Sequence, residues 1–412
     1  SPHSILYSDY FHVSPGVYAS GDFGRFGAKE IHFEVEYDTE LVAELCRLCE
    51  QSGPEAGMLG EREPSLDHAT LVPLYFLNQA NNGRIPCKIV RIGLSGQSLA
   101  EHYHLGMQVA KASNRLGVRV ALIASGDLSH KLAKEGPYGF APEGPLYDER
   151  IMDVMRRGAF GELFEFDEAF CEKAAECGHR SFVIMAGAFD GVAVQANQLS
   201  YEGPFGVGYG VCSFLPAGRD ESRHFLDDYL FKTEAKLQKN KAAEDAYVHL
   251  ARQSLEDYIL HHKTMPIPAG LPSQMLKTRA GTFVSLHKNG QLRGCIGTIA
   301  PITDCIAQEI IQNAISAASR DPRFHAVTAA ELAELEYSVD VLSAAEEIAF
   351  ARDLDVKRYG VIVKSGHKLG LLLPNLDGVD TVEEQIAIAK QKAGIDENEP
   401  VSLQRFEVVR HG

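Results

Sequence analysis

The chain has 412 residues, of which 45% are hydrophobic, and a formal net charge of −16. This length predicts two or three domains, and the composition is typical of a soluble globular protein. The acidic charge argues against unaided binding to nucleic acid, which requires a basic surface, and no apolar run is long enough to cross a bilayer.

The eight cysteines are spread thinly along the chain, and the one Cys-x-x-Cys pair, Cys46 and Cys49, lies in a helical pattern with no second pair nearby. In a chain of this length, such a pattern indicates reduced thiols rather than a disulfide framework. We therefore expect a cytoplasmic protein. The chain opens on a Ser-Pro-His turn of the kind that follows a strand, so we expect an opening segment upstream of it.

Alternating strands and helices are predicted over residues 1–216. The expected strands are 31–37, 86–94, 118–124 and 206–214. The expected helices are 39–51, 99–116, 147–157, 167–177 and the apolar run 181–189. This alternation predicts an α/β domain with a mostly parallel or mixed sheet flanked by helices.

Residues 217–241 are polar and rich in lysine toward their end, so we expect a linker that is helical in part. A second domain is predicted over 242–412. Its expected helices are 246–261, 302–319 and 381–393, and its expected strands are 281–287, 291–296, 335–342, 360–364, 367–373 and 401–409. Lys-Asn-Gly at 288–290 is a tight hairpin signal. Runs of strands mixed with helices favour an α+β fold.

The most informative stretch is Ser-Gly-Asp-Leu-Ser-His at residues 125–130, directly after an apolar run. A buried strand that ends in this way delivers a reactive side chain, here His130, to the carboxyl edge of a sheet, where ligands gather in α/β folds. Side chains of the same kind occur in three other segments: His3, the pair Asp67 and His68, and Glu-Cys-Gly-His at 176–179.

These side chains predict a metal site or an acid–base site. A face of two histidines and one carboxylate suits divalent iron and leaves positions for substrate and dioxygen. A further neutral histidine near such a face can move protons. Simpler roles stay open at this point, because Asp67 is also a good helix cap and residues 125–127 also suit a tight turn.

In the second domain the dense feature is Leu-Arg-Gly-Cys-Ile-Gly at 292–297. Arg293 beside Cys295 suggests a nucleophilic thiol, whereas the simpler interpretation is a small residue in a tightly packed strand. Arg320 and Arg323 follow at the end of a helix. They suit the binding of an anion or ion pairs with nearby acids.

Residues 1–216 resemble the class III extradiol dioxygenases of the LigB-like superfamily, including the Memo-like proteins. The matching segments are Ser-Pro-His-Ser at 1–4, Asp-His-Ala-Thr-Leu-Val-Pro-Leu at 67–74, and the segments 125–130 and 176–179. This resemblance implies Fe(II), or another divalent metal, held by two histidines and one acid, and a small catechol-like aromatic substrate. It places His3 on a ligand histidine, His130 on the acid–base histidine and His68 on a second active-site histidine, with the other ligand histidine in an upstream His-Pro segment.

The third metal ligand stays open between two neighbours. Glu176 is the nearest acid and is the choice that a hard Fe(II) ion favours. Memo-like relatives use a cysteine before the glycine, which here is Cys177. With a Cys177 ligand, a metal-binding scaffold without ring-cleaving activity becomes the rival hypothesis. A metal-dependent hydrolase or lyase is a further alternative.

Residues 242–412 resemble the AMMECR-type domain, through Leu-Arg-Gly-Cys-Ile-Gly at 292–297 and Ser-Arg-Asp-Pro-Arg-Phe at 319–324. The fused arrangement resembles the bacterial AmmeMemoRadiSam system, whose name implies a radical-SAM partner protein. The resemblance implies a fold for this domain but no activity. Whether the chain forms a homo-oligomer stays open.

Overall fold

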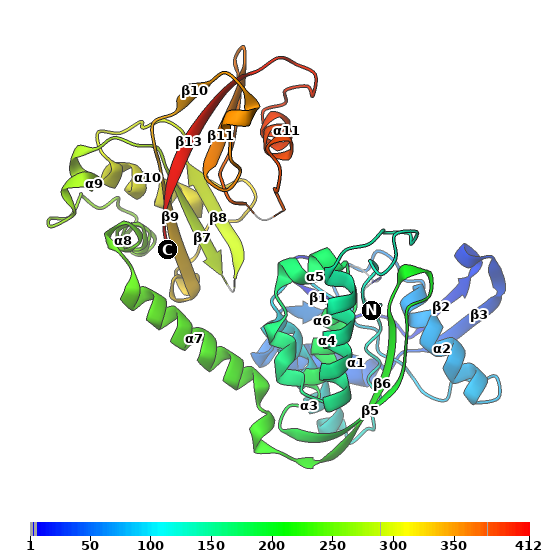
Figure 1. Cartoon of the computed structure of the whole chain (residues 1–412). Coiled ribbons are helices and arrows are strands. Elements are labelled where there is room, and N and C mark those ends of the chain that lie inside the picture. The colour runs from blue at the N-terminus through cyan, green and yellow to red at the C-terminus, as the bar shows by residue number, and fades with distance from the viewer. Residues whose placement is uncertain (1–2, 4–5, 289, 377) are drawn as a thin grey trace. The chain divides into compact units, whose positions relative to one another are not determined.

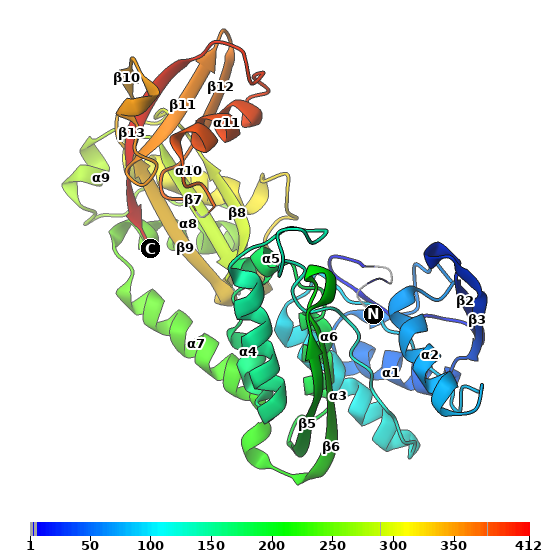
Figure 2. The same cartoon turned by 45° about the vertical axis from the view of Figure 1, so that its right-hand side comes forward.

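The computed structural model describes residue 3 and residues 6–288, 290–376 and 378–412. Its contacts divide the chain between Phe231 and Lys232 into two compact units, here called unit 1 and unit 2. Unit 1 combines helices with two-stranded pairs, and unit 2 has an α+β fold (Figures 1 and 2). In the described part of the chain, no helix has the length and apolar character that a membrane crossing requires.

Unit 1 begins with short strands and two capped helices. Strands β2 (Tyr18–Phe23) and β3 (Ala28–Glu36) form an antiparallel pair, and β1 (Phe11–His12) pairs in parallel with β4 (Ala56–Gly57). The 3-10 turn η1 (Gly24–Phe26) joins β2 to β3.

The two capped helices are α1 (Thr39–Ser52) and α2 (His68–Ala80). The side chains of Asp38 and Asp67 accept hydrogen bonds from the third residue of each helix, which is the usual geometry of an N-cap. The predicted helix at 39–51 is therefore confirmed.

The second half of unit 1 is a helical layer with one long β-ribbon. Its helices are α3 (Leu99–Leu116), α4 (Glu143–Arg157), α5 (Glu168–Ala174) and α6 (His179–Gly187). The ribbon consists of β5 (Val192–Glu202) and β6 (Tyr209–Arg219), which pair in antiparallel fashion and pack on α4 (Figure 1). The 3-10 turns in this half of unit 1 are η2 (Phe160–Glu165), η3 (Pro204–Gly206) and η4 (Glu221–Arg223). The predicted helices at 99–116, 147–157 and 181–189 are confirmed within a few residues.

The sheet of unit 1 is less regular than the sequence predicts. Among its described residues, strands occur only as two-stranded pairs, and residues 86–94 carry isolated bridges such as Tyr37–Ile89. Residues 118–124, predicted as a central strand, form no regular element. Val120 and Ile123 are 42% and 54% exposed, so the run is not enclosed on both faces as a central parallel strand is. The predicted strand at 206–214 starts later and continues to Arg219.

Residues 217–241, expected as a linker, comprise the end of β6, η4 and most of α7 (Phe225–Ala243). The division between the two units falls inside this stretch. The expected partial helix is therefore confirmed. The acidic residues at the start of α7 and the lysine in its last turn favour an α-helix, because they complement its dipole.

Seven strands among the described residues of unit 2 form one antiparallel sheet. Along the sheet the order is β12, β11, β13, β9, β7, β8, and β10 pairs with β13. Their bounds are β7 Thr282–Lys288, β8 Gln291–Gly297, β9 Leu335–Leu342, β10 Glu346–Ile348, β11 Tyr359–Ser365, β12 Lys368–Leu372 and β13 Ser402–His411. Each predicted strand of this unit is present, although residue 289 of the predicted hairpin turn lies outside the described residues.

The helices of unit 2 cover the sheet, and the apolar core of the unit lies between the helices and the sheet. Helices α8 (Ala246–His261) and α10 (Ile306–Ser319) pack on β7 and β9 with a contiguous apolar cluster between them. Helix α11 (Val382–Lys392) covers a second cluster on β11 and β12. The shorter elements are α9 (Ser273–Lys277), η5 (Ala329–Glu334) and η6 (Ala351–Asp353).

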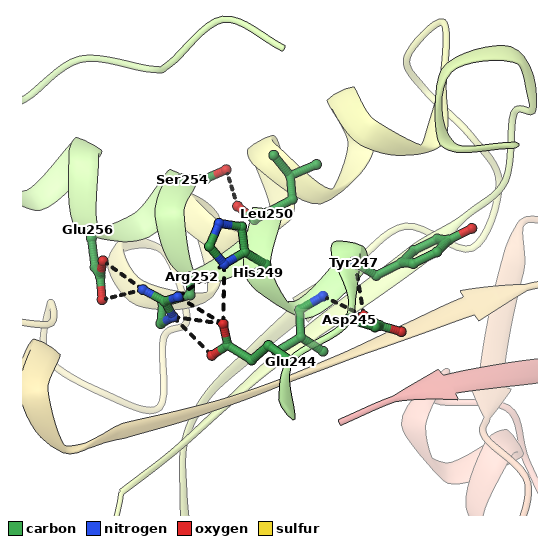
Figure 3. A network of polar contacts seen from close by, with 9 residues as sticks. Glu244, Asp245, Tyr247, His249, Leu250, Arg252, Ser254 and Glu256 are labelled. Carbon is green, nitrogen blue, oxygen red and sulfur yellow. Dashed lines mark hydrogen bonds and ion pairs between the residues drawn. The ribbon is translucent and has the colours of Figure 1, made fainter. Parts of the chain in front are cut away.

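A polar network fixes the start of α8 (Figure 3). Arg252 lies between two acids, with Nη2 2.9 Å from Glu244 Oε2 and Nη1 3.2 Å from Glu256 Oε2. Asp245 caps the helix through the backbone N–H groups of Tyr247 and Val248. The Asp245 carboxylate thus satisfies two of the free N–H groups of the first turn and stabilises the helix start that the sequence predicts.

Candidate metal centre

The segment 125–130 follows the run 118–124 and turns back across unit 1. The Ser125 hydroxyl donates a hydrogen bond of 3.0 Å to the carbonyl oxygen of Ala69, in the first turn of α2. Because His68 begins α2, this bond holds the turn beside the helix start that carries His68. The structure therefore brings together two of the segments that the sequence singled out.

A second contact joins the turn to residues 177–178, just before α6. Asp127 N–H points to Cys177 Sγ at 3.1 Å, and the Asp127 carbonyl oxygen accepts from Cys177 N–H at 3.3 Å and Gly178 N–H at 3.1 Å. The two backbones approach so closely that a Cβ on Gly126 would lie 2.3 Å from Gly178 Cα. Glycine at 126 and 178 therefore permits the approach that places Cys177 against Asp127.

Both ring nitrogens of His130 face oxygen acceptors. Nδ1 bonds to the carbonyl oxygen of Ala175, and Nε2 lies 3.2 Å from Asp127 Oδ2. The Asp127 carboxylate raises the pKa of His130 above its ordinary value, and this effect exceeds the opposing effect of burial. A ring with an acceptor at each nitrogen is suited to carrying a proton, because both nitrogens can donate when the ring is charged.

The rings of His3 and His68 lie against one another at a tilt. Their ring centroids are 4.2 Å apart, with an angle of 31° between the planes. Burial and the neighbouring His68 ring lower the pKa of His3, and Asp127 and His130 also act on it electrostatically. His3 is therefore kept in the neutral form that a metal ligand requires.

Glu176 lies next to Cys177 but points elsewhere. Its Oε2 accepts a hydrogen bond of 2.6 Å from the backbone N–H of His179, the first residue of α6. Burial raises the pKa of Glu176, and the helix N–H groups oppose this shift. The carboxylate is thus engaged in holding the start of α6, whereas its neighbour Cys177 reaches Asp127.

One group among the described residues can hold a metal ion: Asp127, His130 and Cys177, whose ligand atoms lie within 4.8 Å of one another. Burial raises the pKa of the Cys177 thiol to about 12, so a cation against the sulfur is needed to favour the thiolate. Carboxylate, imidazole and thiolate donors suit a divalent transition metal. The site therefore fits a metal ion, and these donors do not identify which one.

Asp127 is the residue of this group that the sequence interpretation missed. The sequence pattern suggests only a tight turn at this position, although the i,i+3 spacing of Asp127 to His130 is a signal for a carboxylate that pairs with a histidine. Such second partners orient the imidazole of many metal and catalytic sites. The signal is weak by itself, since the turn that brings the two side chains together cannot be read from spacing.

Two of the three arginines that the sequence singled out in unit 2, Arg293 and Arg323, pair with acids. Arg293 binds Glu331 through Nε at 2.8 Å and Nη2 at 3.2 Å. Arg323 binds Asp321 through Nε at 2.9 Å and Nη2 at 2.7 Å, which holds the pKa of Asp321 well below its usual range. Arg320 ends α10 and donates its backbone N–H to Ser316.

Cys295 lies on the edge strand β8 and contacts the segment that carries Arg323. Its backbone N–H donates to Asp321 Oδ2 at 2.9 Å, and its carbonyl oxygen accepts from Arg323 Nη2 at 3.3 Å. The Ser285 hydroxyl lies 3.2 Å from Cys295 Sγ. The two motifs of this domain therefore meet, and Asp321 and Arg323 satisfy the backbone groups that an edge strand leaves unpaired.

The fold and the site define a LigB-type unit with a candidate metal centre, joined to an α+β unit. Residues 6–212 match the family model described as the catalytic LigB subunit of aromatic ring-opening dioxygenase. Residues 248–411 match the model described as AMMECR1. Between them the two models cover most of the chain.

The chain is similar to proteins of several organisms. A protein of Clostridium acetobutylicum is 40% identical in an alignment that covers 100% of this chain and 88% of its own. A protein of Thermotoga maritima is 48% identical over 41% of this chain and 98% of its own. An uncharacterized protein of Pyrococcus horikoshii, of known crystal structure, covers 40% of this chain and 88% of its own at 32% identity, with a TM-score of 0.37. The chain belongs to the LigB family and carries an AMMECR1 domain after its LigB domain.

Proposed function

We propose that unit 1 is an iron-dependent oxidoreductase of the extradiol type, acting on a small catechol-like aromatic substrate. The observation that carries this proposal is the gathering of Asp127, His130 and Cys177, with the His3–His68 pair acting on the same site. The match to a family of ring-opening dioxygenases supports the reaction class.

In this proposal His3, Cys177 and Asp127 hold the metal. Both nitrogens of His130, the third member of the group with Asp127 and Cys177, already face acceptors, so we assign His130 to proton transfer and not to the metal. Divalent iron would bring substrate and dioxygen together and exchange electrons with them. His3 is kept neutral by its surroundings, which suits a ligand.

His130 moves the proton. Its Nδ1–H is held by the carbonyl oxygen of Ala175, which leaves Nε2 to take a proton from a substrate hydroxyl. The Asp127 carboxylate, 3.2 Å away, stabilises the imidazolium that results. The same nitrogen can then return the proton to the product, as general acid–base catalysis requires.

His68 is placed to bind an anionic oxygen. It begins α2, and its ring contacts those of His3 and Phe26, with centroid distances of 4.2 Å and 5.6 Å. These ring contacts restrain the ring of His68, so a ring N–H can point to a defined position. A fixed donor stabilises developing negative charge better than a mobile one does.

Metal content separates the two histidine roles. After anaerobic reconstitution with Fe(II), we expect His3→Ala to lose most of its iron and His130→Ala to keep it, while both lose cleavage of simple catechols followed by absorbance. His32→Ala, an exposed histidine on β3, is the matched control and should change neither quantity. Equal iron content in the His3 and His130 variants would reject this division of roles.

A metal-binding scaffold without ring cleavage is the second candidate. The observation that favours it is the placement of Cys177, an oxidisable thiol, in the metal group in place of Glu176. In that case the protein binds iron stoichiometrically, and His3→Ala abolishes binding, yet no catechol is cleaved under any condition that keeps the iron reduced.

A further inference from the structure

Asp148 is a buried carboxylate one turn into α4, and the roles described above do not use it. Its side chain is 1% exposed. Its two oxygens are both engaged: Oδ1 accepts from the backbone N–H of Ser129 at 2.8 Å, and Oδ2 accepts from the Tyr201 hydroxyl at 2.8 Å. Burial raises the pKa of Asp148. No cation pairs with it among the residues that the structure describes.

A buried carboxylate without a cation is costly, because neither hydrogen bond replaces the full hydration of the charge. An apolar residue would fill this place on α4 at lower cost. The carboxylate therefore points to a requirement for its two hydrogen bonds, and the first of them ends on the residue directly before His130.

Ser129 transmits this contact to the ring of His130. Its hydroxyl donates to the carbonyl oxygen of Ala174 at 2.8 Å and accepts from the backbone N–H of Lys131 at 2.9 Å. The neighbouring carbonyl, that of Ala175, accepts from Nδ1 of His130. Two successive residues of the turn thus bind two successive carbonyls at the end of α5. If Ser129 shifts, the bond that orients the imidazole shifts with it.

We propose that Asp148 is a positioning residue, which sets the orientation and tautomer of the His130 ring through Ser129. Asp148 holds the backbone of the turn, Ser129 locks the turn to Ala174, and Ala175 then receives Nδ1–H of His130. This leaves Nε2 directed at Asp127. The proposal concerns the ring of His130 and rests on the proposed function only for the use to which that ring is put.

The two bonds of Asp148 differ in importance. Tyr201 is 42% exposed and, with Asp148, lines a cleft of about 480 Å³ between α4 and β5, so water can replace its hydroxyl. Ser129 is fully buried, so water cannot replace Asp148 on that side. Loss of the acceptor for Ser129 should therefore affect His130 strongly, whereas loss of the Tyr201 hydroxyl should affect it weakly.

The experiment reads the ring nitrogens of His130 directly. The full chain is labelled with ¹⁵N-histidine, and the His130 signals are assigned by their disappearance in His130→Gln. In Asp148→Leu we expect the Nδ1–H form of His130 to lose most of its population. We expect Asp148→Asn, which keeps an acceptor for Ser129, and Tyr201→Phe to preserve most of it. Asp153→Leu, at a partly exposed carboxylate of the same helix that pairs with Arg156, is the matched control.

The outcomes separate this proposal from a general loss of stability and from the proposed function. If Asp148→Leu does not fold, Ser129→Ala is measured in its place, with the same expected loss of the Nδ1–H form. An unchanged His130 spectrum in a folded Asp148→Leu or Ser129→Ala protein overturns the proposal. If the His130 spectrum changes in the variant and the wild-type protein cleaves no catechol, the positioning role stands and the dioxygenase function is rejected.

Discussion

At the scale of single residues, the choice between Glu176 and Cys177 shows how side-chain direction assigns roles. The sequence allows either residue as the third metal ligand, and the preference of Fe(II) for hard ligands favours the carboxylate of Glu176. The structure directs Glu176 to the N–H of His179 and Cys177 to Asp127. The carboxylate thus serves the start of α6, and a different carboxylate, Asp127, joins the metal group.

We therefore predict that Cys177→Ser lowers iron content much more than Glu176→Gln. The glutamine keeps an oxygen that can accept from His179 N–H, so the start of α6 should persist. Iron per chain after anaerobic reconstitution, with circular dichroism as the control for folding, provides the measurement. If Glu176→Gln loses iron and Cys177→Ser keeps it, Glu176 is the metal ligand, as the hardness of Fe(II) suggests from the sequence.

His102, on α3, is a second residue whose environment determines its behaviour. It is fully buried, its Nδ1 lies 2.9 Å from the carbonyl oxygen of Ser98, and burial lowers its pKa to about 3. The folded state therefore keeps the ring neutral, while the unfolded chain takes up a proton below about pH 6.5. Since the unfolded state binds more protons, His102 makes the free energy of unfolding decrease as the pH falls from about 6.5 toward 3.

We predict that His102→Gln removes this pH dependence. At pH 5, wild type should lose about 2 kcal/mol more of its free energy of unfolding, relative to pH 7, than the variant does. Urea unfolding at the two pH values measures the difference. His32→Gln, at an exposed histidine, should follow wild type, and a slope unchanged in His102→Gln would contradict the assignment.

At the scale of elements, the crossing of α3 and α6 depends on small residues. A Cβ on Gly106 would lie 1.9 Å from the carbonyl oxygen of Ile184, and one on Gly187 would lie 1.9 Å from that of Tyr103. The two backbones therefore touch directly. This crossing supports α6, whose start lies beside Cys177.

Gly106→Ala should accordingly lower the free energy of unfolding by roughly 3 kcal/mol, because the added methyl group forces the helices apart. Gly117→Ala is a useful comparison. Gly117 ends α3 with φ of +64° and has open space around it, so only the backbone conformation opposes a side chain, at a cost of about 1 kcal/mol. Equal losses in the two variants would show that the helix crossing tolerates separation.

At the scale of the whole molecule, the chain consists of two units with separate apolar cores. The cluster around Leu250, Ile310 and Val339 belongs to unit 2, and the cluster around Tyr147 and Val183 belongs to unit 1. A unit with its own core can fold alone. The capping network at the start of α8 lies within unit 2 and stabilises a helix of its core (Figure 3).

A fragment of residues 244–412 should therefore fold without unit 1. We expect one cooperative urea transition and a circular dichroism spectrum of mixed helix and strand. The same fragment with Asp245→Ala, which removes the cap of α8, should be less stable by about 1 kcal/mol. A fragment 244–412 that is unfolded in buffer would show that unit 2 needs contacts beyond its own core.

The sequence by itself determined most of unit 2, because its signals are local. Asp245 and Thr381 cap α8 and α11 where the sequence predicts helices, and alternating residues mark β7 and β9. The candidate residues of unit 1 also came from the sequence and its family resemblance. Only the tertiary structure decided that Cys177 meets Asp127 and that Glu176 meets the start of α6. It also added Asp148, which the sequence does not single out and which meets Ser129. These pairs are 19 to 50 residues apart or are set by the direction of one side chain, and neither can be inferred from local pattern.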